Sequence, residues 1–480
     1  MSGLSIYNVK YYLDIKTFYR IHAYMLLPKK ILMKLTKLFT VLFITLCSCT
    51  IVLTSCSEKK SAIPALLERK KSVGSEEEKA HIDSFYNKAV AALQKNPDDL
   101  QQYINLASVY INEGRITGNN SYYDNVAMLM LNKVTESKTG NKDITFQALN
   151  IKSAILLNVH QFKDALEVAK QGVAINTFNA GIYGALVDAN VEMGNYDAAV
   201  KACDQMIAIR PDLRSYSRAS YMRQIYGQNT GAIEAMKMAV ESGQPGSENT
   251  EWARTTLGDL YLGIGKLDSA SYEYRNSLTY RPDYPFAMIG LARVEKAKKN
   301  YDAAIEQTKN TIKIRSEVAF VSLLGDLYAL KGDATKAKET RADMIELLNE
   351  AQKEEKEDAL VKHNANRELA NAYLSANKID EALKYANNDL AMRPDNIDAN
   401  ELAAWIYYLK NDNTNAKLHA DKMMLTNCKN AEKLYKAGVI YAAAGENEKG
   451  QKLIAEAMAT SPYVDQEVIN HTKQAVALNK

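Results

Sequence analysis

The chain has few residues that interrupt helices or that crosslink a fold through disulfides or metal ions. Only 9 of its 480 residues are proline, 5 are cysteine and 6 are histidine. Proline breaks the interior of a helix, so its scarcity permits many uninterrupted helices. No run of alternating β-branched residues is bounded by hairpin turns, so the pattern of a sheet is missing. These absences favour an all-α fold.

Motifs of catalysis are also missing. The sequence contains no Gly-x-Ser-x-Gly elbow, no Gly-x-x-x-x-Gly-Lys-Ser/Thr phosphate loop and no dinucleotide fingerprint after a strand. Paired carboxylates such as Asp98 and Asp99 stand at predicted helix starts, where capping accounts for them. No two histidines have the i, i+4 spacing that places two imidazoles on one helix face for a metal. We expect no enzyme, no cofactor and no metal from His81, His160, His363, His419 and His471.

A repeated order of small and aromatic residues is what the sequence does contain. Between Glu251 and Tyr284 the order is Leu257-Gly258, Tyr261, Ala270, Tyr274 and Pro282. Small residues suit positions where two helices touch, aromatics fill the adjacent groove, and the proline ends the second helix. Parts of the same order recur in Leu324, Gly325, Tyr328, Ala337, Leu369, Ala370, Tyr373, Ala382, Pro394, Ala403, Ala404, Tyr407, Ala416, Ala437, Gly438, Tyr441 and Pro462.

This order resembles the tetratricopeptide repeat, a helix–turn–helix unit of 34 residues. Weaker matches continue it upstream through Leu106, Ala107 and Tyr110, which gives about ten copies between Leu100 and Tyr463. The resemblance implies a right-handed superhelical solenoid of antiparallel helix pairs, whose core lies between neighbouring repeats. We expect one elongated body.

Residue patterns divide the chain further. We expect a leader at 1–55, a tether at 56–80, amino-terminal repeats at 81–247, central repeats at 251–351, carboxy-terminal repeats at 363–464 and a capping helix at 465–480. The repeat frame is disturbed in three places. Gly114 to Gly140 and Ser242 to Asn249 are predicted to be loops, and Leu348 to Asp358 an extended, solvated helix end.

The amino terminus has the pattern of a secretory signal. Lys34 and Lys37 precede an apolar run from Leu38 to Leu53, which is shorter than a bilayer span and is followed by Thr54-Ser55-Cys56. The cysteine after Leu-Thr-Ser resembles the lipobox of bacterial lipoproteins, which implies acylation of Cys56 as the first mature residue. An uncleaved membrane anchor and acylation at Cys49 are the alternatives. Met33 is the expected true start.

Cleavage before Cys56 changes the charge of the protein. The full chain carries a net charge of +3, but residues 1–55 hold seven Lys/Arg and one acidic residue, so the mature chain carries −3. Nothing therefore points to nucleic acid, which demands a clustered basic surface. The two remaining cysteines, Cys203 and Cys428, lie far apart along a solenoid, and we expect them to be free, buried thiols.

Function in a solenoid lies on residues that point into its groove from the first helix of each pair. Extending the repeat positions along each first helix predicts which residues line a partner-binding groove. Both Trp residues of the chain are among them. Trp405 and Tyr408 would be an aromatic anchor or ordinary core. Arg367 and Asn371 match two residues of the clamp with which some tetratricopeptide domains hold a carboxy-terminal carboxylate, although its other positions are missing. The full set is Asp188, Trp252, Asp259, Arg293, Asp326, Arg367, Asn371, Trp405 and Tyr408.

The expected function is that of a membrane-anchored, non-enzymatic scaffold or adaptor that binds protein partners in the bacterial cell envelope. Its expected location is the periplasmic or cell-surface side of a membrane. The resemblance to bacterial lipoproteins implies the outer membrane rather than the inner one, because Ser57 after the acylated cysteine is compatible with onward sorting. A homo-oligomer is left open. One alternative is a surface lipoprotein that captures glycans for uptake, and another is an accessory of a separately encoded enzyme.

Overall fold

The computed structural model describes residues 63–70, 73–354, 359–464, 466 and 468–470. The predicted signal peptide and Cys56 lie outside the described residues, as does most of the predicted capping helix. Residues 65–480 form one compact unit. No helix of the described ranges is both long and apolar enough to cross a bilayer.

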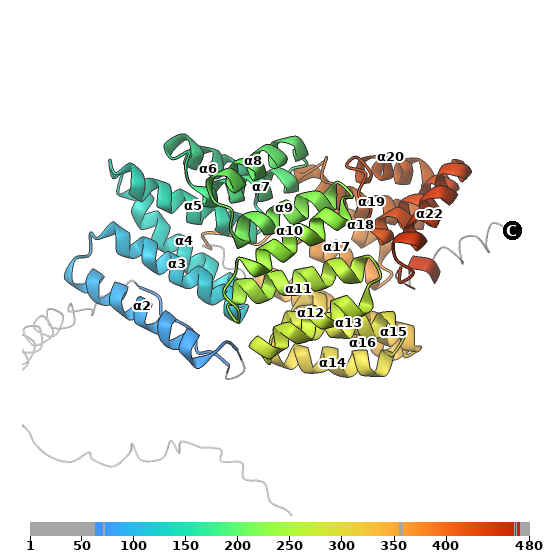
Figure 1. Cartoon of the computed structure of the whole chain (residues 1–480), viewed down its shortest axis with the longest axis horizontal. Coiled ribbons are helices and arrows are strands. Elements are labelled where there is room, and N and C mark those ends of the chain that lie inside the picture. Colours follow the sequence, from blue (N-terminus) through green and yellow to red (C-terminus); the bar gives the residue numbers. More distant parts are fainter. Residues whose placement is uncertain (1–62, 71–72, 355–358, 465, 467, 471–480) are drawn as a thin grey trace, which may run out of the picture. The chain divides into compact units, whose positions relative to one another are not determined.

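Every regular element of the described residues is a helix, and these helices follow one another along the chain (Figure 1). They are α2 (Glu76–Lys95), α3 (Leu100–Thr117), α4 (Asn120–Glu136), α5 (Lys142–Asn158), α6 (Phe162–Ile175), α7 (Ala180–Glu192), α8 (Tyr196–Ile209), α9 (Leu213–Ile225), α10 (Asn229–Glu241), α11 (Glu248–Gly263), α12 (Leu267–Tyr280), α13 (Pro285–Ala297), α14 (Tyr301–Ile314), α15 (Val318–Lys331), α16 (Ala334–Glu354), α17 (Asn366–Ser375), α18 (Ile379–Met392), α19 (Ile397–Leu409), α20 (Asn413–Met423), α21 (Ala431–Ala443) and α22 (Asn447–Thr460).

The helices pack as consecutive pairs, from α3 with α4 to α21 with α22, and each pair packs on the next. Most first helices also contact the first helix of the following pair, such as α5 with α7 and α19 with α21. Successive second helices are not in comparable contact. The first helices are therefore the closer-spaced, inner layer of a curved stack. The predicted all-α solenoid of paired helices is confirmed.

Tyr274 shows why small residues recur in the repeat. Its ring is fully buried between α11 and α13, where a Cβ atom added to Gly258 would come within 2.5 Å of the ring and one added to Gly290 within 2.3 Å. Its hydroxyl donates a hydrogen bond to Asp259 at 2.7 Å. Glycine on both neighbouring first helices thus makes room for one aromatic side chain of the second helix between them.

Contacts between residues 200 to 205 positions apart show that the superhelix closes on itself. The backbone N–H of Ile397 donates to the Tyr196 hydroxyl, Asn229 donates to the carbonyl of Lys429, and Arg315 donates to the carbonyl of Arg115. Six repeats of 34 residues amount to about 204 residues. Six repeats therefore complete one turn, and the second turn rests on the first.

The short loops between paired helices also contribute to the contacts between the two turns of the superhelix, which we call the seam. Gly194 has a φ of +78°, and a Cβ atom there would lie 2.5 Å from the backbone carbon of Asp395 in the second turn. Gly265 is likewise left-handed and faces Pro462. At both places the left-handed residue of the first turn thus contacts a loop that follows a second helix of the second turn.

The disturbed parts of the repeat frame have different outcomes. The prediction of a loop from Gly114 to Gly140 is wrong, because α4 occupies Asn120–Glu136 and buries Tyr123, Val126, Met130 and Leu131. The loop at 242–247 is present, although α11 begins at Glu248. The predicted extension of a helix beyond Leu348 is confirmed as far as Glu354 by α16, and the rest of that prediction, at 355–358, lies outside the described residues.

Part of the predicted tether is packed on the repeats. The backbone N–H of Leu67 donates to the Tyr123 hydroxyl at 3.0 Å, and Arg69 donates to the Glu113 carboxylate at 2.6 Å. α2 begins at Glu76, still inside the predicted tether. The described tether residues from Leu67 onward thus belong structurally to the solenoid.

Candidate functional site

The inner face of the solenoid carries rows of opposite charges. Arg293 donates to Asp259, which occupies the same position one repeat earlier, at 3.3 Å. Lys433 pairs with Asp398, and Lys436 lies 2.9 Å from Glu401, again across adjacent first helices. Each pair brings a cation and a carboxylate of adjacent repeats together. A partner binding here would compete with them for the same groups.

The polar residues of the predicted groove are at least partly accessible. Asp326 accepts a hydrogen bond from Arg341 at 3.1 Å. Arg367 lies 3.9 Å from Asp398, and the exposed Asn371 donates its amide to the carbonyl of Arg367 at 2.9 Å. Asp188 forms a two-point ion pair with Arg218, at 2.9 and 2.5 Å.

Trp405 and Tyr408 lie in the core of the α19 to α22 region. Their rings stack with centroids 5.1 Å apart, and only 5% and 7% of their surfaces are exposed. The Lys436 ammonium lies 5.9 Å from the centre of the Trp405 ring. Direct contact with a partner would therefore require these rings to be uncovered, and their predicted role as an anchor stays a prediction. Trp252, the other tryptophan, is 38% exposed.

A cavity of about 200 Å³ lies between the two turns of the superhelix. Arg393 in its wall is only 1% exposed and forms two hydrogen bonds of 2.7 Å with the Asp389 carboxylate, together with an ion pair to Glu192 of the first turn. Its guanidinium also lies over the Phe162 ring. The cavity is lined by Leu157, Asn158, His160, Phe162, Asp188, Glu192, Asn364, Arg367, Asp389 and Arg393.

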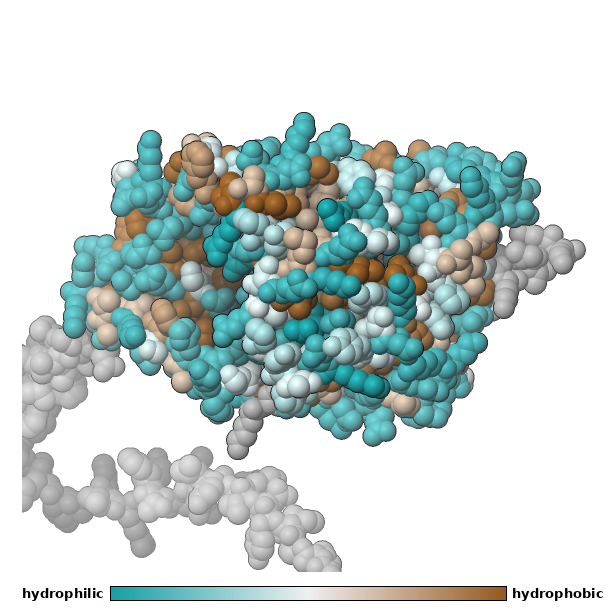
Figure 2. Space-filling view, viewed as in Figure 1, coloured by the Kyte–Doolittle hydropathy of each residue, from teal (hydrophilic) through white to brown (hydrophobic). Residues whose placement is uncertain are grey.

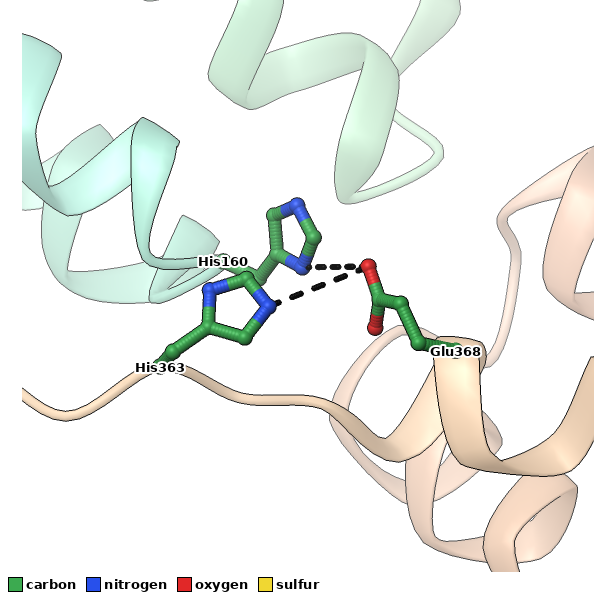
Figure 3. A group of neighbouring side chains, drawn as sticks. All are labelled: His160, His363 and Glu368. Carbon is green, nitrogen blue, oxygen red and sulfur yellow. Dashed lines mark ion pairs between the residues drawn. The ribbon is translucent and has the colours of Figure 1, made fainter. Parts of the chain in front are cut away.

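Two histidines and a glutamate meet beside this cavity (Figure 3). His160 belongs to the turn between α5 and α6, His363 to the segment before α17, and Glu368 to the first turn of α17. Oε1 of Glu368 lies 3.4 Å from Nδ1 of His160 and 3.8 Å from Nε2 of His363. All three donor atoms lie within 4.8 Å of one another, which is the kind of cluster that holds a metal ion.

The surroundings of the cluster shift its titration. Burial lowers the pKa of the His160 imidazole, which favours the neutral ring. Burial alone would raise the pKa of Glu368, but a hydrogen bond from His363 and the charges of both histidines hold that pKa below its usual value. The two shifts favour an ionised Glu368 carboxylate and a neutral His160 imidazole.

This cluster could not be predicted from the spacing of histidines, because its two histidines lie far apart in the chain. His160 and His363 are brought together by the superhelical turn, and no local pattern records that pairing. The one available signal was the insertion after Leu348, which lengthens one repeat and supplies the segment that carries His363. The two cysteines in the described residues, Cys203 and Cys428, are free and buried, as predicted.

Hydrophilic side chains cover most of the face drawn in Figure 2, and hydrophobic ones appear between them as separate patches. The most exposed large apolar side chains, Phe178, Tyr272 and Leu425, belong to three different segments. No single element of the described chain gathers them into one apolar surface. The cavity and the inner face, where polar groups lie in defined positions, are therefore the candidate binding sites.

A helical-repeat solenoid with a polar inner face is the class of protein that this fold and site define. Residues 180–213, which cover α7 and α8, match the tetratricopeptide repeat family. The match supports that family and places one 34-residue unit on the helix pair expected from the pattern. In other pairs the small residue expected on the second helix is likewise buried, as at Ala270, Ala337, Ala382 and Ala416.

Comparison with individual proteins finds remote likenesses. A protein CTR9 homolog from Arabidopsis thaliana is 25% identical over 256 residues, which are 52% of this chain and 19% of that protein. The chain thus spans about a fifth of the length of the curated relative it matches. PilF of Pseudomonas aeruginosa is 14% identical at a TM-score of 0.36, covering 43% of this chain and 93% of that one. A tetratricopeptide protein from Thermus thermophilus is 19% identical at 0.35, covering 41% and 98%.

Proposed function

We propose that the protein is a non-enzymatic scaffold, anchored by lipid at Cys56 in a bacterial cell envelope, that binds a protein partner on the inner face of its solenoid. The observation that carries the proposal is the row of polar side chains that successive first helices present on that face. Repeat solenoids bind partners on such surfaces, and the family match at 180–213 is consistent with a protein-binding repeat.

The inner face suits an extended, polar segment with charges of both signs. Asp259 and Arg293, and likewise Asp398 and Lys433, form pairs across adjacent repeats. Each pair offers a carboxylate and a cation. The backbone or side chains of a partner can bind these groups in place of the contact within the pair. The Asp259–Arg293 pair is exposed, and such pairs contribute at most about 1 kcal/mol, so exchanging it for contacts with a partner costs little. Lys433 is more buried, with 12% of its side chain exposed.

The anchor rests on the sequence pattern around Cys56 rather than on the described residues. The lysines, the short apolar run and the cysteine after Leu-Thr-Ser match a lipoprotein signal. Cys56→Ala would then leave the protein without lipid. Metabolic labelling with a fatty acid followed by membrane fractionation tests this part separately from partner binding.

Partner binding is tested by crosslinked pull-down of the full-length protein from intact envelopes, followed by mass spectrometry. Arg367→Ala and Asn371→Ala on α17 are the test variants. Arg275→Ala and Asn310→Ala are the matched controls, because these residues are exposed on the second helices α12 and α14. All four variants should retain the circular dichroism of the wild type.

The proposal predicts one or a few envelope proteins that the wild type and both controls capture and that the α17 variants lose. Equal capture by all variants would place binding elsewhere. Recovery of polysaccharide without protein would support the glycan-capturing alternative instead.

A further inference from the structure

We propose that His160, His363 and Glu368 form a binding site for a divalent transition-metal ion, zinc foremost, that joins the first turn of the superhelix to the second. Two imidazoles and one carboxylate are a recurring zinc ligand set. The three residues come from both turns (Figure 3). An ion held by all three would thus bridge parts of the chain about 200 residues apart.

Two of the three separations between donor atoms are close to the value that zinc requires. Zinc binds nitrogen and oxygen at about 2.0–2.2 Å, so neighbouring ligand atoms of a tetrahedral site lie about 3.3 Å apart. Glu368 Oε1 lies 3.4 Å from His160 Nδ1 and 3.8 Å from His363 Nε2. All of the donor atoms fall within 4.8 Å of one another. Small side-chain rotations would complete three of the four positions, leaving one for water.

One oxygen of the Glu368 carboxylate is left without a hydrogen bond to the described residues. This Oε2 atom is buried and has no hydrogen-bond partner within the part of the chain that the structure describes. A carboxylate oxygen withdrawn from water without a partner is unfavourable, and a cation bound at Oε1 would offset part of this cost through the charge that the two oxygens share. The same carboxylate already directs its other oxygen at both histidines.

The backbone on both sides is fixed in the position that the cluster needs. The N–H of Asn364 donates to the carbonyl of Val159 at 2.9 Å, and Gln161 donates to the carbonyl of Lys362 at 2.9 Å. The N–H of Val361 donates to the Asn125 side chain at 3.2 Å. These hydrogen bonds hold the segment before α17 against the first turn, and they flank both histidines.

His160 also stands where later repeats of the first turn have glycine. Its φ is +57°, and Gly194, Gly227 and Gly265 take the same left-handed conformation at the following turns. Lys299 shows that a long side chain is tolerated there when it points away. At His160 the imidazole instead turns into the seam between the two turns, where strain at a non-glycine residue often accompanies a function.

Metal binding requires a change of tautomer at His160. Nδ1 lies 3.2 Å from the carbonyl oxygen of Asn364 as well as 3.4 Å from Glu368, and both of these atoms are acceptors. Without a metal, Nδ1 therefore carries the ring proton. An ion bound at Nδ1 takes the neutral ring with its proton on Nε2, and no net proton is released.

Zinc titration of the tag-free full-length protein tests the site by calorimetry and by metal analysis after gel filtration. We expect one ion per chain and a higher melting temperature with zinc. His363→Gln should weaken binding at least about tenfold, because it removes a ligand from a segment outside any helix. His419→Gln is the matched control, since His419 is partly buried but contacts Asn400 instead.

Cobalt(II) gives an independent readout. Bound to the wild type and to the His419→Gln variant, it should show the visible absorption of a four-coordinate ion, which His363→Gln should lose. Equal zinc affinity in His363→Gln and wild type, or the absence of stoichiometric binding in the wild type, would overturn the proposal and leave the cluster as an ion pair between turns.

Discussion

The hydroxyl of Tyr196 accepts a hydrogen bond of 2.8 Å from the backbone N–H of Ile397, a residue 201 positions later in the chain. Tyr196 is 5% exposed and Ile397 is 3% exposed, so water cannot replace the bond. A side chain on α8 thus accepts a hydrogen bond from the first backbone N–H of α19, which has no acceptor within its own helix. The bond is one of several that make the two turns of the superhelix a single structure.

Tyr196→Phe should lower the free energy of unfolding by about 1–3 kcal/mol, because the buried N–H of Ile397 loses its acceptor. Denaturant titration followed by circular dichroism measures the change. Tyr183→Phe is the control, because that tyrosine is only partly buried and packs against the clusters on either side of α7. Equal effects of the two substitutions would contradict the role of the hydrogen bond.

Comparing Gly194→Ala with Gly332→Ala distinguishes the cost of backbone strain within a turn from the cost of disturbing the contacts between the two turns of the superhelix. Both glycines are left-handed, with φ of +78° and +89°. A Cβ atom at Gly194 meets the backbone of Asp395 at 2.5 Å, whereas no atom of the described residues lies within 4 Å of one at Gly332. Both variants should lose about 1–2 kcal/mol to backbone strain. Gly194→Ala should lose about 1–3 kcal/mol more because of the clash, and equal losses would show that the turns do not touch there.

Arg393→Met should destabilise the protein by about 3–5 kcal/mol, because it leaves the carboxylates of Asp389 and Glu192 without their buried cation. The Arg393 side chain is 1% exposed, whereas Lys410, paired with Asp380, is 34% exposed. Lys410→Met should therefore cost at most about 1 kcal/mol. Thermal and chemical unfolding of the two variants compare a buried pair with a surface pair.

Glu401 should make stability depend on pH in the acidic range. Burial alone would raise the pKa of this carboxyl, but Lys436 and Lys433 hold its pKa at about 2 in the folded protein. A lowered pKa means that the carboxylate stabilises the fold above its ordinary pKa of 4.5, and that this stability is lost as the pH falls towards 2. Unfolding measured between pH 5 and pH 2 checks the sign. Glu401→Gln should flatten that part of the profile, and an unchanged slope would contradict the assignment.

The helix pairs could be predicted from the sequence because their causes are local. Alanine and glycine at helix contacts, tyrosines such as Tyr274 in the grooves and left-handed glycines such as Gly265 recur within 34 residues. The error at Gly114 to Gly140 has a local cause too. Asn and Ser obscured the helical spacing of Tyr123, Ala127, Met130 and Val134 on α4, all of which are buried.

The contacts between turns could not be predicted in the same way. How many pairs complete one turn depends on a small rotation per pair, which accumulates over six repeats and leaves no motif in the chain. The meeting of His160 with His363 and Glu368 follows from that rotation together with the longer repeat before α17. Prediction of Trp405 as a groove residue was limited similarly, since the frame gives its repeat position but not the packing of α21 and α22 around it.

Distance measurement between Lys163 and Lys362 tests closure of the superhelix most directly. Both side chains are exposed, and the neighbouring Gln161 contacts the carbonyl of Lys362. Spin labels at Lys163→Cys and Lys362→Cys, in a variant whose native cysteines are serine, report the distance by pulsed electron paramagnetic resonance. A closed superhelix predicts a narrow distribution below roughly 25 Å, given the length of two labels. A straight stack of six pairs spaced by about 10 Å would separate them by roughly 60 Å, and a distance near that value would contradict the account.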